Sequence, residues 1–184
     1  MSLTELLVPA SAQMLRALSG WLDKAQAQGP GAETLLAARL APDMYPLSSQ
    51  IRFACLQAQE ATYRLMGETV PEALDRLARE GREAGERPGS LTEAKARIGE
   101  ALARLAGLGP DALDAGAGRT ITLELPGGLI FDLTGERYAR DWALPQFYFH
   151  LMTAYAILRS RGIDLGKADY VPHMFAYLRP APAP

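Results

Sequence analysis

Apolar side chains recur at helical spacing, every three or four positions, in four long stretches of the chain. The stretches cover residues 3–27, 46–67, 90–106 and 143–162. Within each stretch the apolar positions fall on one face of a helix, and such a face is buried when helices pack together. The pattern therefore predicts four long helices that pack as a bundle.

Prolines, glycines and capping residues give the expected limits of these helices. Pro145 is expected in the first turn of the last helix, where proline is tolerated. Pro9 is expected either near the start of the first helix or at a kink in it. Ser90 and Glu93 have the spacing of a capping box, which predicts a helix start at Ser90. Gly67 is the expected C-terminal end of the second helix.

Two weaker helical patterns lie between the long ones. The stretch AETLLAARL, residues 32–40, predicts a short helix that is stopped by Pro42. The charged stretch at residues 71–89 predicts a short exposed helix followed by a linker.

The spacing of apolar residues changes to two in residues 119–134. Here RTITLEL and LIFDLTG flank Pro126-Gly127-Gly128, which predicts a β-hairpin. An isolated hairpin is only marginally stable in water, so it is expected to pack on the helices. The sequence thus predicts an all-α four-helix bundle with an inserted hairpin at about 119–134. We expect one domain over residues 1–178 and a disordered Pro/Ala tail at 179–184.

Charge and hydropathy exclude several classes of protein. The net charge is −2 and the lysines and arginines are scattered, whereas a nucleic-acid-binding protein usually has a basic face. No apolar run approaches the ~18 residues of a membrane span. The N-terminus lacks the basic region of a signal peptide. We therefore expect a cytoplasmic protein that binds neither nucleic acid nor membrane.

Sequence motifs of the common catalytic sites are absent. The chain has no GxxxxGK[ST], no HExxH and no GxSxG. Cys55 is the only cysteine, so no internal disulfide and no CxxC site can form. It lies beside the apolar face of a helix, which predicts a buried and unreactive thiol.

Two polar residues occupy inward positions of the predicted helices. Gln50 and His150 each fall on an apolar face, and Asp43 precedes the second helix at the same end of the bundle. These three are the candidate catalytic residues. An interior pocket with aromatic walls is the second expectation, because small-molecule sites are mostly apolar with a few polar groups. Its expected lining is Gln50, Phe147, His150, Ala154 and Tyr155. A lone inward histidine is also commonly a hydrogen-bonded core residue.

Three segments resemble a bacterial family of unknown function in the DinB/YfiT-like superfamily. They are LSGWLDKA, RLAPDMYPLSSQIRFAC and LPQFYFHLMTAYAILRSRGIDLGKADY, which lie far apart along the chain. The resemblance implies an up-down-down-up four-helix bundle that is often a homodimer. It implies no DNA binding.

The resemblance also implies where a metal would lie. Metal-binding members of that superfamily carry three histidines, one early in the second bundle helix and an HxxxH pair on the fourth. Some of them transfer a low-molecular-weight thiol. The matching positions here are Gln50, His150 and Ala154. Because alanine has no donor atom and an amide is a poor ligand for zinc or nickel, the sequence predicts no metal cofactor.

Three functions follow from these expectations. The first is a metal-free bundle that binds a small molecule or forms a homodimer. The second is a divalent-metal-dependent transferase or hydrolase that uses His150, with zinc or nickel as its cofactor. The third is an interaction protein whose contact surface is residues 71–89 or the hairpin.

Overall fold

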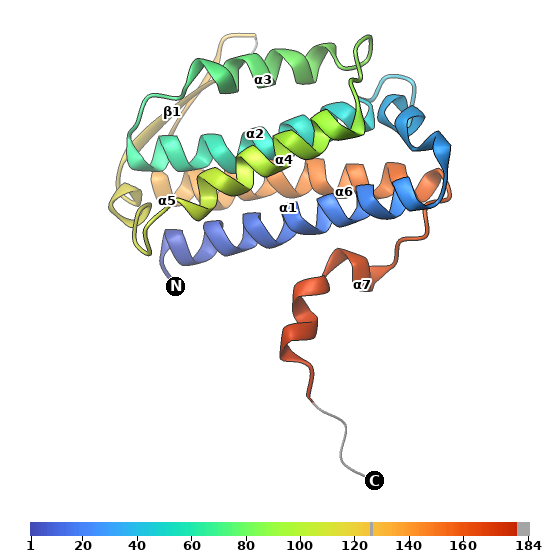
Figure 1. The fold of residues 1–184 in the computed structure, drawn as a ribbon. Coiled ribbons are helices and arrows are strands. Elements are labelled where there is room, and N and C mark those ends of the chain that lie inside the picture. Colours follow the sequence, from blue (N-terminus) through green and yellow to red (C-terminus); the bar gives the residue numbers. More distant parts are fainter. Residues whose placement is uncertain (126, 180–184) are drawn as a thin grey trace.

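A computed structural model describes residues 1–125 and 127–179. Its four long helices are α1 (Leu3–Ala27), α2 (Leu47–Met66), α4 (Leu91–Ala106) and α6 (Leu144–Ser160). Helices α1 and α6 run in one direction and α2 and α4 in the other (Figure 1), which confirms the up-down-down-up bundle. Pro126 and nearly all of the expected disordered tail, residues 180–184, lie outside the described residues.

Helix α1 begins at Leu3, before Pro9. Ser2 accepts a hydrogen bond from the backbone of Glu5, and the Glu5 carboxylate accepts one from the Ser2 backbone, so a capping box starts the helix. Pro9 therefore lies inside α1 rather than at its start. The carbonyl that loses its helical donor belongs to Glu5, an exposed residue of the first turn.

Helices α2 and α4 have the limits that the sequence predicts. Gly67 ends α2 in the left-handed region at φ +70°. Ser90 and Glu93 form the expected capping box of α4, with the Ser90 backbone donating to Glu93 over 2.8 Å. The segment before α2 forms a 3₁₀-helix, η1 (Pro30–Ala37), in place of the short helix expected there.

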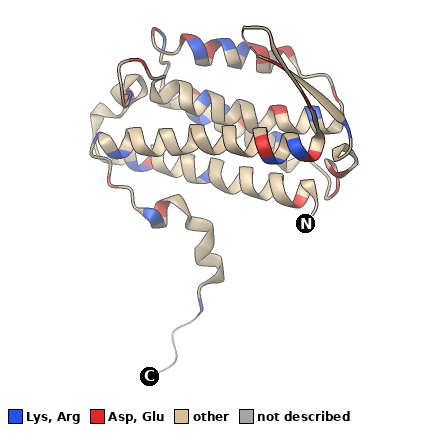
Figure 2. Cartoon of the chain, turned by 180° about the vertical axis from the view of Figure 1, so that it is seen from behind, with Lys and Arg blue, Asp and Glu red and all other residues tan. Residues whose placement is uncertain are grey.

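Helix α3 (Glu72–Glu83) crosses the outer side of α2 (Figure 1). Charged residues of both signs occur along its length (Figure 2), as expected for an exposed helix. Its inner face buries Leu74 and Leu77. At Gly81 a β-carbon would lie 2.6 Å from the Phe53 ring, so glycine lets α3 approach α2 closely.

The predicted hairpin is confirmed. Strands β1 (Thr120–Leu125) and β2 (Leu129–Thr134) pair antiparallel, with Ile121 opposite Leu133. Ile121 and Leu123 are buried in a cluster that includes Leu65 of α2. The hairpin therefore packs on the bundle through β1, while β2 is largely exposed.

Helix α6 begins at Leu144 with Pro145 in its first turn, as expected, but it continues a helical run that starts about ten residues earlier. A continuous helical run begins with α5 (Gly135–Arg137) and passes through η3 (Tyr138–Ala143), a π-helical segment, into α6. The Leu144 N–H donates to the carbonyl of Ala139, five residues back. This wider turn accommodates Pro145, which has no N–H to continue the normal ladder.

No helix in the described ranges, 1–125 and 127–179, has both the length and the apolar character that a bilayer span requires.

Three backbone segments lie in close contact beside the hairpin. They contain Leu65 at the end of α2, Gly116 before β1 and Gly135 after β2. A β-carbon on Gly116, in the 3₁₀ turn η2 (Asp114–Gly116), would overlap the Leu65 carbonyl, and one on Gly135 would overlap the Gly116 carbonyl. Only glycine at these two positions allows the approach.

Gly116→Ala is expected to lower the free energy of unfolding by about 2–4 kcal/mol, because backbone atoms cannot move aside as a side chain can. Gly118→Ala is the matched control, since nothing lies within 4 Å of its β-carbon and its φ is not positive. It should change stability by no more than about 0.5 kcal/mol. Urea denaturation of both variants measures the effect, and equal midpoints would show that the contact is not tight.

Candidate functional site

Gln50 and His150 meet between two neighbouring helices. Gln50 lies in the first turn of α2 and is 2% exposed, and His150 lies in the middle of α6 and is half-buried. The Oε1 atom of Gln50 is 2.8 Å from Nδ1 of His150. Two of the candidate residues, 100 positions apart in the chain, are therefore in direct contact.

The second hydrogen bond of Gln50 determines the protonation of the imidazole. Its Nε2 donates to the Tyr45 carbonyl over 3.2 Å, and because a carbonyl only accepts, the amide nitrogen must face Tyr45. The amide oxygen then faces His150, so Nδ1 carries the hydrogen. Nε2 of His150 is left with a lone pair that can accept a hydrogen bond.

Aromatic rings surround the imidazole. The ring centroids of Phe53 and Phe149 lie 5.1 and 5.3 Å from that of His150, and Tyr45 packs edge-on against Phe53 at 5.3 Å. Burial lowers the pKa of His150 to about 4. The imidazole is therefore neutral at pH 7 and acts as an acceptor rather than as a cation.

The other expected pocket residues point elsewhere. Ala154 is fully buried one turn after His150. Phe147 borders a separate interior cavity of about 10 Å³, which has room for about one water molecule. Tyr155 packs against Trp21 at 5.4 Å between ring centroids, toward the C-terminal segment. Asp43 is exposed, and within the described ranges it makes no hydrogen bond or ion pair with Gln50 or His150.

The segment GIDLGKADY has a structural role. Trp21 of α1 donates to the Asp169 carbonyl over 2.8 Å and stacks on Tyr170, both in the short helix α7 (Lys167–Tyr170). The Asp169 carboxylate pairs with Lys24 at 2.7 Å and accepts from the Gly166 backbone. Asp169 thus anchors α7 to the bundle.

Cys55 is fully buried, and burial raises the pKa of its thiol to about 12. The thiol stays protonated at physiological pH, as expected for an unreactive cysteine.

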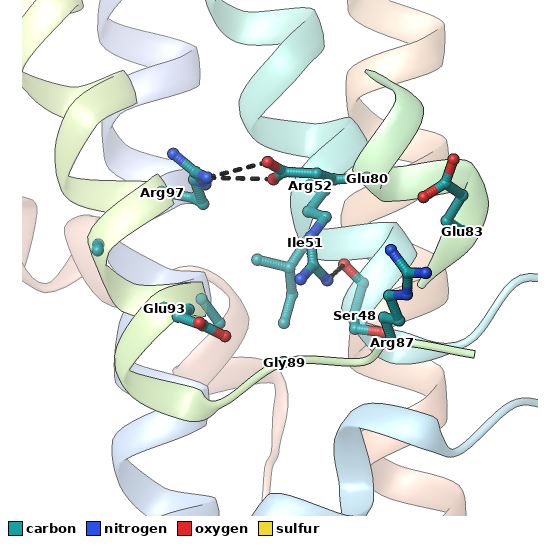
Figure 3. A pocket seen from close by; sticks show the side chains of 11 residues that line it. Ser48, Ile51, Arg52, Glu80, Glu83, Arg87, Gly89, Glu93 and Arg97 are labelled. Atoms are coloured by element: carbon teal, nitrogen blue, oxygen red, sulfur yellow. Dashed lines mark hydrogen bonds and ion pairs between the residues drawn. The ribbon is translucent and has the colours of Figure 1, made fainter. Parts of the chain in front are cut away.

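Sequence reasoning missed a second polar site. A cavity of about 460 Å³ lies between α2, α3 and α4, and Arg52 and Arg97 are among its walls (Figure 3). An arginine on an amphipathic helix gives no signal that distinguishes a cavity wall from a solvated face.

A family model, "Domain of unknown function (DUF1993)", matches residues 3–171 of the chain. The chain belongs to the DUF1993 family. The crystal structure of a DinB family member protein from Shewanella denitrificans is similar to the DUF1993 chain at 32% identity and a TM-score of 0.72. The match covers 99% of this chain and 96% of that one. No curated protein matches the sequence. The expected family and fold are thus confirmed.

The donor set of this DUF1993 protein does not fit the metal that the resemblance implies. The three corresponding positions hold Gln50, His150 and Ala154. Gln50 and Nδ1 of His150 are hydrogen-bonded to each other, so Nε2 of His150 is the one nitrogen left to bind a metal. Among the described residues, no three His, Cys, Asp or Glu side chains are placed so that they could hold a metal ion together. One imidazole nitrogen is far from the three or four ligands that zinc requires.

The lowered pKa of His150 predicts a pH dependence of stability. The pKa is 6.5 for an unperturbed histidine and about 4 in the folded protein, so between these values the unfolded state binds more protons. The contribution of neutral His150 to the free energy of unfolding is therefore fully present above pH 6.5 and is lost as the pH falls toward 4. It should amount to about 1–3 kcal/mol.

His150→Asn is the matched control, because an asparagine amide can donate to Gln50 but does not titrate. Denaturant unfolding at pH 7 and pH 4.5 should show a larger loss of stability in the wild type than in the variant. The carboxylates of the chain contribute equally to both proteins. Parallel pH profiles would contradict the assignment of a buried neutral imidazole.

Proposed function

We propose that this DUF1993 protein is a metal-free binding protein whose small-molecule ligand donates a hydrogen bond to Nε2 of His150. The hydrogen bond between Gln50 and His150 carries the proposal. It directs the lone pair of the imidazole away from Gln50. Because the ring is neutral, this lone pair is available over the whole physiological pH range.

The surrounding rings favour a ligand with an aromatic or other flat apolar body. Tyr45, which packs against Phe53, is 46% exposed. Phe149, which packs against His150, is 58% exposed. Exposed rings beside a buried polar pair offer stacking surfaces together with one directional acceptor. An aromatic molecule with a hydroxyl or N–H group matches both features.

Phenol and indole should therefore raise the melting temperature of the protein, and toluene, which has no donor, should raise it less. The shift from phenol and indole should be lost in His150→Asn, which keeps a partner for Gln50 but has no atom at the position of Nε2. Thermal denaturation with each compound, on protein purified without a histidine tag, measures the effect. Equal shifts in both proteins would contradict a role for Nε2.

Elemental mass spectrometry on the same sample tests the alternative of a metal-dependent transferase or hydrolase. The proposal expects far less than one equivalent of zinc or nickel. About one equivalent in the wild type that is lost in His150→Ala would favour the metalloenzyme and contradict the proposal.

A homodimer is a second candidate function, favoured by the outer face of α6. No charged residue occurs between Asp141 and Arg159, and Phe149 and Met152 are 58% and 45% exposed on this stretch. Figure 2 shows the uncharged length of the helix between charged ends. An apolar face of this kind is usually covered by a partner, and in a symmetric dimer the same face of a second copy covers it.

Met152→Glu should weaken self-association at least tenfold, because a two-fold axis places the new charge on both sides of the interface. Phe131→Glu is the control, since Phe131 is equally exposed at 45% but lies on the hairpin. Sedimentation equilibrium at micromolar concentrations measures both variants. A wild-type mass of 19.9 kDa, that of one chain, would contradict the dimer.

A further inference from the structure

The cavity between α2, α3 and α4 is lined by charged side chains. Its charged lining is Arg52 of α2, Glu80 and Glu83 of α3, Glu93 and Arg97 of α4, and Arg87 of the segment that joins α3 to α4. Arg52 is two positions after Gln50, and two residues turn a helix by about 200°. The cavity therefore opens on the opposite side of α2 from the Gln50–His150 pair.

Arg97 is paired with two carboxylates of the protein. Its Nη2 lies 3.1 Å from the Glu80 carboxylate and its Nη1 lies 3.2 Å from that of Glu100. Figure 3 shows the contacts to Glu80 across the cavity. This guanidinium joins α3 to α4 and has little capacity left for a ligand.

Only the Nη1 group of the Arg52 guanidinium forms hydrogen bonds among the described residues. Its Nη1 donates to the carbonyls of Ser48 and Pro88, at 3.2 and 3.1 Å. Its Nε is buried and finds no acceptor in the part of the chain that the structure describes. Within the same ranges, Nη2 forms no hydrogen bond, and no carboxylate lies within 4.0 Å of the guanidinium to form an ion pair.

The free part of Arg52 is the part that recognises oxyanions. Nε–H and Nη2–H lie on one edge of the guanidinium and point in parallel, which matches the two oxygens of a carboxylate or phosphate. The half-buried guanidinium of Arg52 cannot lose its charge at physiological pH, so an anion is its natural partner.

The connecting segment leaves room beside this edge. Gly89 has φ +77°, and a β-carbon on it would lie 2.5 Å from Oε2 of Glu93 and 2.9 Å from Nη2 of Arg52. Arg87 and Glu83 are exposed at the cavity and, within the described ranges, form no ion pair. The lining carries three guanidiniums and three carboxylates, but Glu80 is paired with Arg97, and Glu93 accepts a hydrogen bond from the Ser90 backbone. The cations left for an anionic ligand are Arg52 and Arg87.

We propose that this cavity binds a small organic anion whose carboxylate or phosphate group is held by Nε and Nη2 of Arg52, with Arg87 as a second cationic contact. The proposal goes beyond the binding function proposed above, because the two sites share no residue and lie on opposite sides of α2.

Isothermal titration calorimetry with sodium succinate and with sodium phosphate tests the proposal, with sodium chloride at equal ionic strength as the reference. We expect saturable binding of at least one of the two anions at millimolar or lower concentration. The two anions distinguish a carboxylate-binding from a phosphate-binding cavity, and either result supports the proposal.

Three variants show whether Arg52 holds the anion. Arg52→Lys keeps the charge but loses the two-pronged edge, and it should weaken binding about tenfold. Arg87→Gln removes an exposed side chain without internal bonds, so it should fold normally and weaken binding by a smaller factor. Arg76→Gln, an exposed position of α3 outside the cavity, changes the net charge equally and should bind as the wild type does.

Two results would overturn the proposal. One is the absence of binding of either anion to the wild type. The other is equal weakening in Arg87→Gln and Arg76→Gln, which would assign the effect to net charge rather than to the cavity. Because His150→Asn leaves this cavity intact, it should bind the anion normally even if the proposed His150 site is wrong.

Discussion

Helix α2 is enclosed by its neighbours, and this enclosure determines where polar groups can lie in the bundle. Fourteen of its 20 residues are buried, since α3, α4, α6 and the hairpin base pack around it. Polar side chains on such a helix have little access to water and must find partners inside the protein. Gln59 and Thr62 find their partners within α2, because both side chains donate to backbone carbonyls of this helix. Gln50 and Arg52 reach beyond their own helix, and each defines a site.

The partner of Gln50 also decides which chemistry its side of α2 supports. Metal ligands must converge with free lone pairs on one point. Here the amide oxygen and the imidazole Nδ1 are 2.8 Å apart and bind each other. The two nitrogens of an imidazole point in widely different directions, so Nε2 cannot share a ligand position with that amide. An inward histidine in this fold therefore becomes a hydrogen-bond acceptor once its helical neighbours lack donor atoms, as Ala154 does.

The sequence predicts those features that depend on spacing along one helix. The four helices, the capping box at Ser90 and the inward positions of Gln50 and His150 all follow from a repeat of three to four residues. Features that depend on several segments together were missed. Pro145 lies in the first turn of α6 as its spacing predicts, but the π-helical segment that joins α6 to α5 was not expected. Phe147 and Tyr155 belong to the same aromatic stretch as His150, yet their directions around α6 place them against different neighbours.

The role of Arg52 was also missed, because the cavity that it borders is formed by three helices together. Arg52 and His150 show how two basic side chains respond differently to burial. His150 and Arg52 lie at or near α2 on its two sides, and burial lowers the pKa of both. Histidine responds by losing its proton, so its side of the helix becomes neutral. Arginine cannot respond in this way, because its pKa starts so high that the charge remains. Its free N–H groups must then be matched by an acceptor from outside the chain or remain unpaired at a cost. The same physical constraint thus produces a neutral acceptor on one face of α2 and a cationic donor on the other.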